Sequence, residues 1–315
     1  MTEAIFFEPV FKETIWGGNR LHSVYGYAIP SDHTGECWAI SAHPNGDCKI
    51  ANGPYQGKTL SWLWQHHREL FGDLKGDVFP LLIKYIDAHD DLSVQVHPDD
   101  DYAGKYERSL GKNECWYVLD CEKHTRMVMG HSASSKAEAE KLIETEDYAH
   151  FLHFIDIKPG DFYSIPAGTI HAICGGSLIY EVQQSSDITY RVYDYDRTDV
   201  NGNRRALHVK QSLDVLKIPG DVPSIMKKEY PFSGGTEIIY LETLDFHVSR
   251  IVMDGQADFT NEEPMILLSV IAGDGYLDST KLEKGMNLMI PSTMKAFRLS
   301  GQMQLMKTIV GRKLK

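Results

Sequence analysis

The chain has 315 residues, with 44 acidic and 32 basic side chains and a formal net charge of −12 at neutral pH. A chain of this length can bury a substantial core as one large domain or two modest ones, and its acidic balance disfavours a nucleic acid as partner, although a local basic pocket would still accept a small phosphorylated ligand. Five scattered cysteines without a Cys-x-x-Cys pair suit a reducing compartment, and because neither a signal peptide nor a membrane-spanning run is visible, we expect a cytoplasmic protein with no membrane partner.

The first third of the chain predicts short strands and one helix. Apolar runs cut by turns over residues 5–60 indicate β structure, whereas leucine and aromatic residues recur near helical spacing over residues 59–71. His66 and His67 are adjacent on this helix and are interpreted as part of a solvated face. Lys84 lies inside an apolar segment that predicts a buried strand; it either snorkels from an edge strand or serves a buried site, and the segment alone does not decide between the two.

Polar side chains alternate with apolar ones in two segments that follow. The strand period places Ser93, Gln95 and His97 on one face of the first segment. The same period places Lys112 and Glu114 together on one face of the second segment. If the two strands pair, these side chains converge in a β-rich core, where such a cluster is costly unless a metal or a charged ligand compensates it. We therefore interpret the two segments as a metal site beside an anion site.

A third segment presents a histidine at a fixed position. Residues 158–173 contain a Pro-Gly turn, a short strand and a second turn, so that His171 begins the next strand. A lone histidine in such a place is more often a hydrogen-bonded core residue than a ligand. The turn that aims it, and the need for a further donor beside Gln95, His97 and Glu114, favour a ligand here.

Two carboxylates and an arginine follow His171. Glu181, Asp187 and Arg191 are separated by even numbers of residues, so on an unbroken strand they would share a face. From spacing alone an ion-pair ladder is the better interpretation, but their position after a candidate ligand favours a functional role. Helices are expected over residues 101–110, 134–151 and 208–216.

The turn frame that ends at His171 resembles the second motif of the cupin family: Gly, five residues, Pro, one residue, Gly, two residues, His. The frame recurs from Gly285 to Ala296, with Ala296 in the place of His171. We therefore expect a mainly β bicupin, made of two jelly-roll β-barrels with short helical excursions. Residues 1–225 would form the catalytic cupin domain, and residues 226–315 a second, metal-free cupin-like domain.

Motifs along nearly the whole chain resemble the type I mannose-6-phosphate isomerases, in the short bacterial form. They are Trp16-Gly17-Gly18, Gly35-Glu36-Cys37-Trp38, Ser93-Val94-Gln95-Val96-His97-Pro98, Gly111-Lys112-Asn113-Glu114-Cys115-Trp116-Tyr117, Pro166-Ala167-Gly168-Thr169-Ile170-His171-Ala172 and Ser186-Asp187-Ile188-Thr189-Tyr190-Arg191. The Gln-x-His and Lys-x-Glu pairs are the more diagnostic of these.

The resemblance implies a role for each matching position. The zinc ligands, for one ion per chain, would be Gln95, His97, Glu114 and His171. Arg191 would be catalytic. The residues that line the substrate and phosphate pocket would be Lys84, Ser93 and Lys112, with the pocket carboxylates Glu181 and Asp187, and with Trp16 and Glu36 at the pocket mouth.

The family's chemistry fits these residue types. The expected reaction interconverts mannose 6-phosphate and fructose 6-phosphate through a cis-enediol, whose negative charge a zinc ion with an open position would stabilise. Arg191 would add a permanently charged donor, and Lys84 and Lys112 would offset the phosphate. The proton-transfer group is open among Lys112, Glu181 and Asp187. The expected partner is a small sugar phosphate, with the protein a monomer or a weak homo-oligomer.

Two alternatives stay open. Mixed nitrogen and oxygen ligation does not select zinc by itself, so the site would also suit another metal cupin, such as an iron-dependent sugar-phosphate isomerase or a dioxygenase. A non-catalytic sugar-phosphate-binding cupin is the alternative from a different class. Arg191 and Asp187 argue against it, because binding alone needs no pair positioned for proton transfer.

Overall fold

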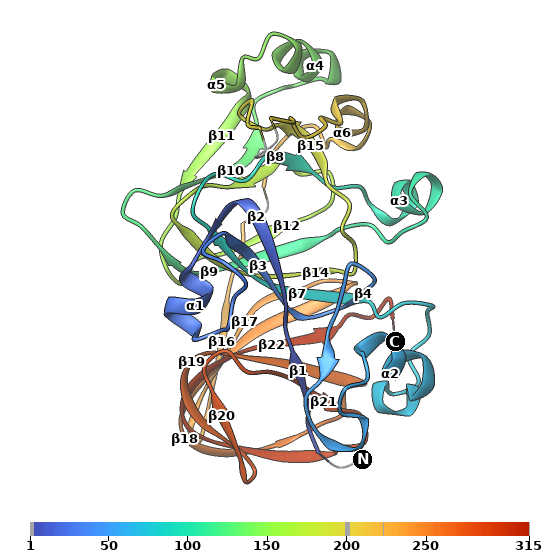
Figure 1. The fold of residues 1–315 in the computed structure, drawn as a ribbon, viewed down its shortest axis with the longest axis vertical. Helices are drawn as coiled ribbons and strands as arrows, with labels where there is room; N and C mark the ends of the chain where they lie inside the picture. Colours follow the sequence, from blue (N-terminus) through green and yellow to red (C-terminus); the bar gives the residue numbers. More distant parts are fainter. Residues whose placement is uncertain (1–2, 199–201, 223, 315) are drawn as a thin grey trace.

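The computed structural model describes residues 3–198, 202–222 and 224–314. The protein is mainly β, as expected, with short helices at its periphery (Figure 1). Its described strands pair into sheets of nine, six, five and two strands. The six- and five-stranded sheets make up the upper part of the molecule in Figure 1, and the nine-stranded sheet makes up the lower part.

The six-stranded sheet forms one wall of the upper part. In spatial order its strands are β12 (Phe162–Ile165), β9 (Glu114–Cys121), β14 (Ser177–Gln184), β7 (Leu81–Ala88), β2 (Val10–Gly18) and β3 (Thr34–Ile40). All eight residues of β7 and all eight of β14 are buried, because both faces of this sheet are covered. Alternation along these strands sends Lys84 and Glu181 to one face and Tyr85 and Val182 to the other.

The five-stranded sheet packs on the face that carries Lys84 and Glu181. Its strands are, in order, β11 (Leu152–Asp156), β10 (Arg126–His131), β13 (His171–Ile173), β8 (Val94–Val96) and β15 (Tyr190–Tyr193). Trp116 of β9 shares one apolar cluster with Met127 and Ile173 of this second sheet. The two sheets therefore enclose a common interior.

The nine-stranded sheet covers the opposite face of the six-stranded one. Its strands run in the order β16 (Lys228–Phe232), β17 (Gly235–Glu242), β18 (Phe246–Thr260), β22 (Ala296–Val310), β19 (Met265–Leu277), β21 (Asn287–Pro291), β1 (Ile5–Glu8) and β6 (Lys49–Ile50), with β20 (Thr280–Glu283) on β19. Tyr85 and Val182 share a core cluster with Met265 and Leu267 of β19. Because β1 and β6 join this sheet, N-terminal strands pair with strands from the C-terminal part of the chain.

The remaining elements are short. The two-stranded sheet pairs β4 (Ala42–His43) with β5 (Gly46–Asp47). The helices are α1 (Arg20–Tyr25), η1 (Gly53–Tyr55), α2 (Leu60–His66), η2 (Arg68–Phe71), α3 (Asp100–Tyr106), α4 (Lys136–Glu144), α5 (Tyr148–Phe151) and α6 (Val209–Val215). The prediction of one helix over residues 134–151 is wrong, because the chain breaks between α4 and α5, where Glu146 takes a left-handed conformation with φ 55°. The helix expected over residues 59–71 is likewise divided, into α2 and η2.

The predicted internal repeat has matching local geometry. Gly160 and Gly285 have φ angles of 91° and 92°, values that favour glycine. A strand follows each of them, β12 in the first copy and β21 in the second, and the next strand begins at His171 in one copy and at Ala296 in the other. The described strands pair into open sheets, so the two closed jelly-roll barrels stay a prediction.

Candidate active site

Three predicted site residues lie side by side on the five-stranded sheet. The register of β13, β8 and β15 pairs Gln95 with His171 on one side and with Arg191 on the other. Residues directly opposite each other in an antiparallel ladder share a face. The sheet therefore presents an imidazole, an amide and a guanidinium in one row.

A second row crosses the six-stranded sheet. Glu181 pairs with Trp116 and with Lys84, and Lys84 pairs in turn with Trp38. The indole nitrogen of Trp116 donates to Oε2 of Glu181 at 2.9 Å, and the Lys84 ammonium lies 5.0 Å from the centre of the Trp38 ring. The two carboxylates nearest to the Lys84 ammonium are Oε2 of Glu36 at 3.5 Å and Oε1 of Glu181 at 3.7 Å. This row places Lys84 and Glu181 as a pair in the interior between the six- and five-stranded sheets.

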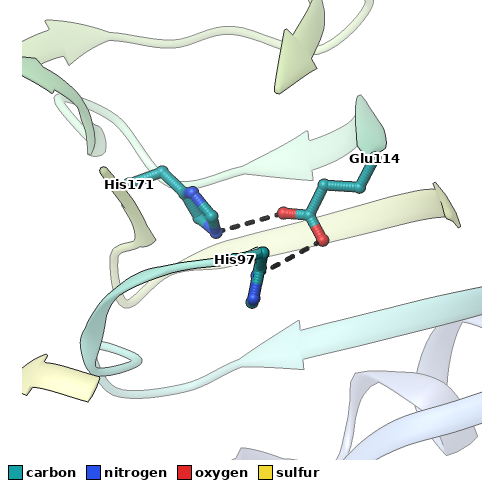
Figure 2. A group of neighbouring side chains, drawn as sticks. All are labelled: His97, Glu114 and His171. Carbon is teal, nitrogen blue, oxygen red and sulfur yellow. Dashed lines mark ion pairs between the residues drawn. The ribbon is translucent and has the colours of Figure 1, made fainter. Parts of the chain in front are cut away.

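His97, Glu114 and His171 form a compact buried group (Figure 2). Their candidate ligand atoms all lie within 4.8 Å of one another. Nε2 of His171 is 3.1 Å from Oε1 of Glu114, and Nε2 of His97 is 3.6 Å from Oε2 of the same carboxylate. The three side chains come from the start of β13, the end of β8 and the start of β9, so they meet only because the two sheets are packed together.

Each imidazole is oriented by a backbone carbonyl. Nδ1 of His97 donates to the carbonyl of Ile188 at 2.8 Å, and Nδ1 of His171 donates to the carbonyl of Thr169 at 2.9 Å. These hydrogen bonds place the proton on Nδ1 and leave the lone pair of Nε2 directed at the group's centre. Burial, together with the nearby Lys112 ammonium, lowers the pKa of His97 well below its ordinary value and keeps this imidazole neutral.

The group contains buried polar atoms that the described residues leave without a hydrogen-bond partner: both carboxylate oxygens of Glu114 and Nε2 of His171. The Lys112 ammonium approaches Glu114 to 2.9 Å and Nε2 of His97 to 3.1 Å. Burial would raise the pKa of Glu114, but the charge of the neighbouring Lys112 ammonium acts against it, and this pKa lies well below its usual range. Lys112 offsets the charge of the carboxylate from one side, but Oε1 of Glu114 and Nε2 of His171, which are both acceptors, face each other at 3.1 Å, an arrangement that is costly unless a cation lies between them.

These residues fit a metal ion. Two imidazole nitrogens and a carboxylate oxygen are ligands that zinc and other divalent transition metals accept. The amide of Gln95 is the further candidate donor, because Gln95 pairs with His171 and precedes His97 by two positions, the spacing that places strand residues on one face. The orphaned atoms of Glu114 and His171 are the observation that supports the assignment.

A cavity of about 370 Å³ adjoins this group. Nine residues singled out from the sequence line it: Trp16, Glu36, Lys84, Ser93, Gln95, Lys112, Glu181, Asp187 and Arg191. Because Lys112 both lines the cavity and contacts Glu114, the His–Glu–His group and the cavity form one site. A separate cavity of about 390 Å³ lies beside β1 and β21 and is lined mainly by apolar atoms, for example those of Phe6 and Met286.

The buried Lys84 ammonium in the cavity wall is balanced by neighbouring carboxylates. Burial opposes the charge on Lys84, but Glu36 and Glu181 outweigh it and raise the pKa of its ammonium. Burial and the neighbouring charge of Glu114 raise the pKa of Glu181. Oε1 of Glu181 has no hydrogen-bond donor among the described residues. The pKa of Glu181 is therefore higher than that of an ordinary glutamate, a shift that favours its protonated form.

Arg191 is held in place by three neighbours on two segments. Its Nε donates to the hydroxyl of Ser93 at 3.2 Å, and its terminal nitrogen donates to the carbonyl of Ala206 at 3.1 Å. Its backbone N–H donates to Nδ1 of His208 at 3.3 Å. The guanidinium is thus fixed before any ligand enters, while one side still lines the cavity.

The structure corrects two expectations about pairing. The strands of residues 93–97 and 112–119 do not pair, since β8 and β9 belong to different sheets and face each other across the interior. Glu181, Asp187 and Arg191 do not share one unbroken strand, because the chain leaves the six-stranded sheet at Gln184 and enters the five-stranded one at Tyr190. All three nevertheless line the cavity. Glu181 belongs to the six-stranded sheet, Arg191 to the five-stranded sheet, and Asp187 to the segment that connects them.

Some site residues were missed by the sequence reasoning. Thr14, Thr189, Arg205 and His208 also line the cavity. Arg205 forms a bidentate pair with the carboxylate of Asp194, with its Nε 2.8 Å from Oδ2. The local sequence could not reveal these four residues, because a polar residue taken alone does not show which distant segments it lies beside in the fold. Trp16 is only 4% exposed, so it belongs to the cavity wall rather than to its mouth.

The packed sheets and the buried His–Glu–His group together define a cupin-type protein with a candidate metal centre. Comparison with known families agrees with this class: residues 236–310 match the mannose-6-phosphate isomerase cupin domain, and residues 5–129 match the family described as phosphomannose isomerase type I, catalytic domain. The chain belongs to the type I phosphomannose isomerase family, and the predicted resemblance is confirmed.

The relatives cover nearly the full length. The chain is 46% identical to the mannose-6-phosphate isomerase ManA of Bacillus subtilis over 309 residues, which is 95% of this chain and 96% of that protein. It is 45% identical to the mannose-6-phosphate isomerase of Streptococcus mutans, with 97% and 98% of the two chains covered. The crystal structure of the mannose 6-phosphate isomerase from Bacillus subtilis superposes with a TM-score of 0.96 at 45% identity, covering 98% of this chain and 99% of that one. Among the described residues, no helix is long and apolar enough to cross a membrane.

Proposed function

We propose that this protein is a zinc-dependent aldose–ketose isomerase that interconverts mannose 6-phosphate and fructose 6-phosphate through a cis-enediol intermediate. The relatives with 45% and 46% identity are named mannose-6-phosphate isomerases. The single observation that carries the proposal is the cavity that joins a buried His–Glu–His group to basic side chains, among them Lys84, Lys112 and Arg191. An anionic substrate beside a divalent ion accounts for both features.

The proposed zinc ligands are Gln95, His97, Glu114 and His171. With one carboxylate and three neutral donors, the site keeps a net positive charge when a divalent ion is bound. The ion then supplies Lewis-acid stabilisation of the negative charge that develops on the sugar oxygens. Its ligands are held rigidly, because the carbonyls of Ile188 and Thr169 fix both imidazole rings.

The basic residues bind and orient the substrate. A phosphate monoester carries about −1.5 to −2 charges near neutral pH, so Lys84 and Lys112 together offset most of its charge. Arg191 presents a planar donor that Ser93 and Ala206 hold in one orientation, which suits it to stabilise an enediol oxygen. Ser93, Trp16 and Glu36 complete the proposed pocket. A small sugar phosphate is thus the proposed partner, with no nucleic acid or membrane involved.

Glu181 is the proposed proton-transfer group. Its pKa is raised by burial and by the charge of Glu114, and its Oε1 has no hydrogen-bond donor among the described residues. Asp187 is exposed and accepts a hydrogen bond from Asn45 at 2.9 Å, while Lys112 is engaged with Glu114. A base with a pKa adjusted towards the working pH is the better catalyst, which favours Glu181 over the other two candidates.

A coupled assay of mannose 6-phosphate conversion, with and without a chelator, tests the proposal. We expect fructose 6-phosphate to form, the activity to disappear with the chelator, and zinc to restore it to the metal-free protein. Restoration by ferrous iron but not by zinc would support the alternative metal cupin. Metal-dependent binding of mannose 6-phosphate without any fructose 6-phosphate would support the non-catalytic binding protein and refute the isomerase.

The proposed molecular organisation has two cupin domains. Residues 1–225 form the catalytic cupin domain and residues 226–315 the second, metal-free one, although β1 and β6 complete the sheet of the second domain. A bicupin arrangement is supported by the matching turns at Gly160 and Gly285. The five free thiols are consistent with a cytoplasmic enzyme, and we propose a monomer or a weak homo-oligomer.

A further inference from the structure

Asn113 lies between Lys112 and Glu114 in the sequence, and its side chain bridges two distant parts of the chain. Nδ2 donates to Oδ2 of Asp245 at 2.8 Å, and Oδ1 accepts from the backbone N–H of Ala167 at 2.8 Å. A carboxylate cannot donate and an N–H cannot accept, so these partners fix the orientation of the amide. Both halves of the Asn113 amide are therefore used, in opposite directions.

The backbone of Asn113 is also held. Its N–H donates to Oε1 of Gln184 at 2.9 Å, and its carbonyl accepts from the N–H of Gln184 at 3.1 Å. Nε2 of Gln184 donates to Oδ1 of Asp100 at 3.0 Å, and the same oxygen accepts from the N–H of Gly111 at 2.8 Å. The loop that leads to Glu114, the first residue of β9, is thus held by backbone hydrogen bonds at Gly111 and at Asn113.

The second partner, Ala167, belongs to the turn that precedes His171. The next residue in this turn, Gly168, donates its N–H to the carbonyl of His97 at 2.8 Å. The segments that carry the three members of the His–Glu–His group are therefore linked: His97 to the turn, and the turn to Asn113 beside Glu114. A shift of Asn113 would move Glu114 and His171 relative to each other.

The first partner, Asp245, comes from the C-terminal region at the turn before β18. Its carbonyl accepts from the N–H of Gly311 at 2.8 Å, and its Oδ1 lies 3.4 Å from the ammonium of Lys313. Lys313 also pairs with Asp100. Asp245 is therefore held by the segment that follows β22. It reaches the loop before Glu114 directly through Asn113, and indirectly through Lys313 and Asp100.

We propose that Asn113 is a positioning residue that ties the C-terminal region, through Asp245, to the Glu114 and His171 segments of the metal centre. The C-terminal region then contributes to metal affinity without supplying a ligand. The inference rests on the proposed metal centre and deepens it. Residues that orient metal ligands typically change the metal affinity by about 10- to 100-fold when they are replaced.

The donor and acceptor of this pair can be exchanged without changing side-chain size. Asn113→Asp keeps the acceptor for the Ala167 N–H but places a carboxylate against that of Asp245. In the double variant Asn113→Asp with Asp245→Asn, the amide at position 245 donates to the carboxylate at position 113, so the hydrogen bond between these two positions is restored with reversed polarity. Recovery in the double variant distinguishes this contact from a general loss of folding.

The experiment measures the zinc affinity of the full-length protein by competition with a chromophoric chelator, together with kcat, KM and the midpoint of denaturant unfolding. We expect Asn113→Asp to weaken zinc binding by about tenfold or more and the double variant to recover at least half of that loss on a logarithmic scale. A loss of less than about threefold in Asn113→Asp, or a recovery of less than half, would overturn the proposal. If Asn113→Asp does not fold, Asp245→Ala leaves the loop sequence intact and is expected to weaken zinc binding similarly; unchanged affinity there would overturn it as well.

Asn261→Asp is the matched control. Asn261 is a buried asparagine of the C-terminal region whose Nδ2 donates to the carbonyls of Pro291 and Met294 at 3.0 and 3.1 Å. Its replacement should lower the unfolding midpoint and leave the zinc affinity unchanged. A wild-type protein that binds no zinc would refute the metal centre and the inference with it, whereas wild-type binding with unaffected variants would refute the inference alone.

Discussion

Glu114 is the residue on which the proposed metal centre depends most, because it lies between both histidines and its carboxylate can carry the negative charge of the group. Its two oxygens are 3.1 and 3.6 Å from Nε2 of His171 and His97. We expect Glu114→Ala, and likewise His171→Ala, to lower the bound metal strongly and to reduce isomerase activity to below about 1% of wild type, since a single lost ligand removes both affinity and orientation. Metal content by mass spectrometry and the coupled assay measure the two effects. Glu140→Ala, on the exposed face of α4, is the control; full turnover in a verified metal-free preparation would contradict the ligand assignment.

Arg191 should separate metal binding from chemistry. Its guanidinium lines the cavity and is held by Ser93, and it makes no contact with the His–Glu–His group in the described hydrogen bonds and ion pairs. We expect Arg191→Ala to lower kcat by about 100- to 1,000-fold with the metal retained, as removal of one charged donor at a developing oxyanion does. Arg191→Lys, which keeps the charge but not the planar donor, should recover only part of the rate. An effect confined to KM would make Arg191 a binding residue.

Proton transfer can be followed at Glu181. The amide in Glu181→Gln keeps the size of the side chain and can still accept from Trp116, but it cannot carry the proton. We expect kcat to fall by about 100- to 10,000-fold and the exchange of the sugar C2 hydrogen with deuterated solvent, followed by NMR, to fall in parallel. Asp187→Asn serves as the comparison. Normal exchange in Glu181→Gln with slow exchange in Asp187→Asn would transfer the assignment to Asp187.

At the scale of elements, local patterns predicted the site where it lies on one strand. The period of two predicted that Gln95 faces away from Val94 and Val96, and these two valines are buried on either side of it. The turn before His171 correctly predicted a histidine at a strand start. Patterns could not show that β8 and β9 lie in different sheets, because the packing of one sheet on another depends on the whole chain. Arg205 was missed for the same reason.

Asp194, which directly follows β15, forms an ion-pair cluster with two arginines, and this cluster should make the stability of the protein depend on pH. Asp194 accepts from Arg197 at 2.7 Å and from Nε of Arg205 at 2.8 Å. Burial alone would raise the pKa of Asp194, but these hydrogen bonds outweigh it and hold the pKa below the ordinary value of 3.8. A carboxyl whose pKa is lower in the folded than in the unfolded state stabilises the fold above the unfolded value, and this stabilisation is lost as pH falls through the folded one.

Asp194→Asn should therefore destabilise the protein at pH 7 and not at strongly acidic pH. We expect a loss of about 1 kcal/mol in the free energy of unfolding at pH 7, since the cluster is partly open to solvent. The difference from wild type should shrink as the pH falls below about 4. Denaturant titrations at several pH values measure it, with Asp258→Asn as an exposed ion-pair control. A difference that is constant over pH would show that the charge of Asp194 has no role.

At the scale of the whole molecule, one turn frame occurs twice and serves two purposes. In the first copy it places His171, fully buried, beside Glu114. In the second copy Ala296 is exposed and pairs with Thr260 at the end of β18. Apolar side chains such as Met253, Met303 and Leu305 form one core cluster on the nine-stranded sheet, which supports the proposal that the second copy serves packing.

Ala296→His should accordingly create no second metal site. The new imidazole would point from an exposed position, and the corresponding interior offers apolar groups instead of a carboxylate and a second imidazole. We expect the zinc content to stay at one ion per chain by mass spectrometry, with unchanged isomerase activity and only a small change in the unfolding midpoint, since surface substitutions usually alter stability by about 0.5 kcal/mol or less. The same substitution in a protein that also carries His171→Ala controls for transfer of the ion from the first site. A second bound zinc that survives dialysis against a weak chelator would show that the C-terminal region retains ligands of its own, and the division into one metal-binding and one metal-free domain would then be wrong.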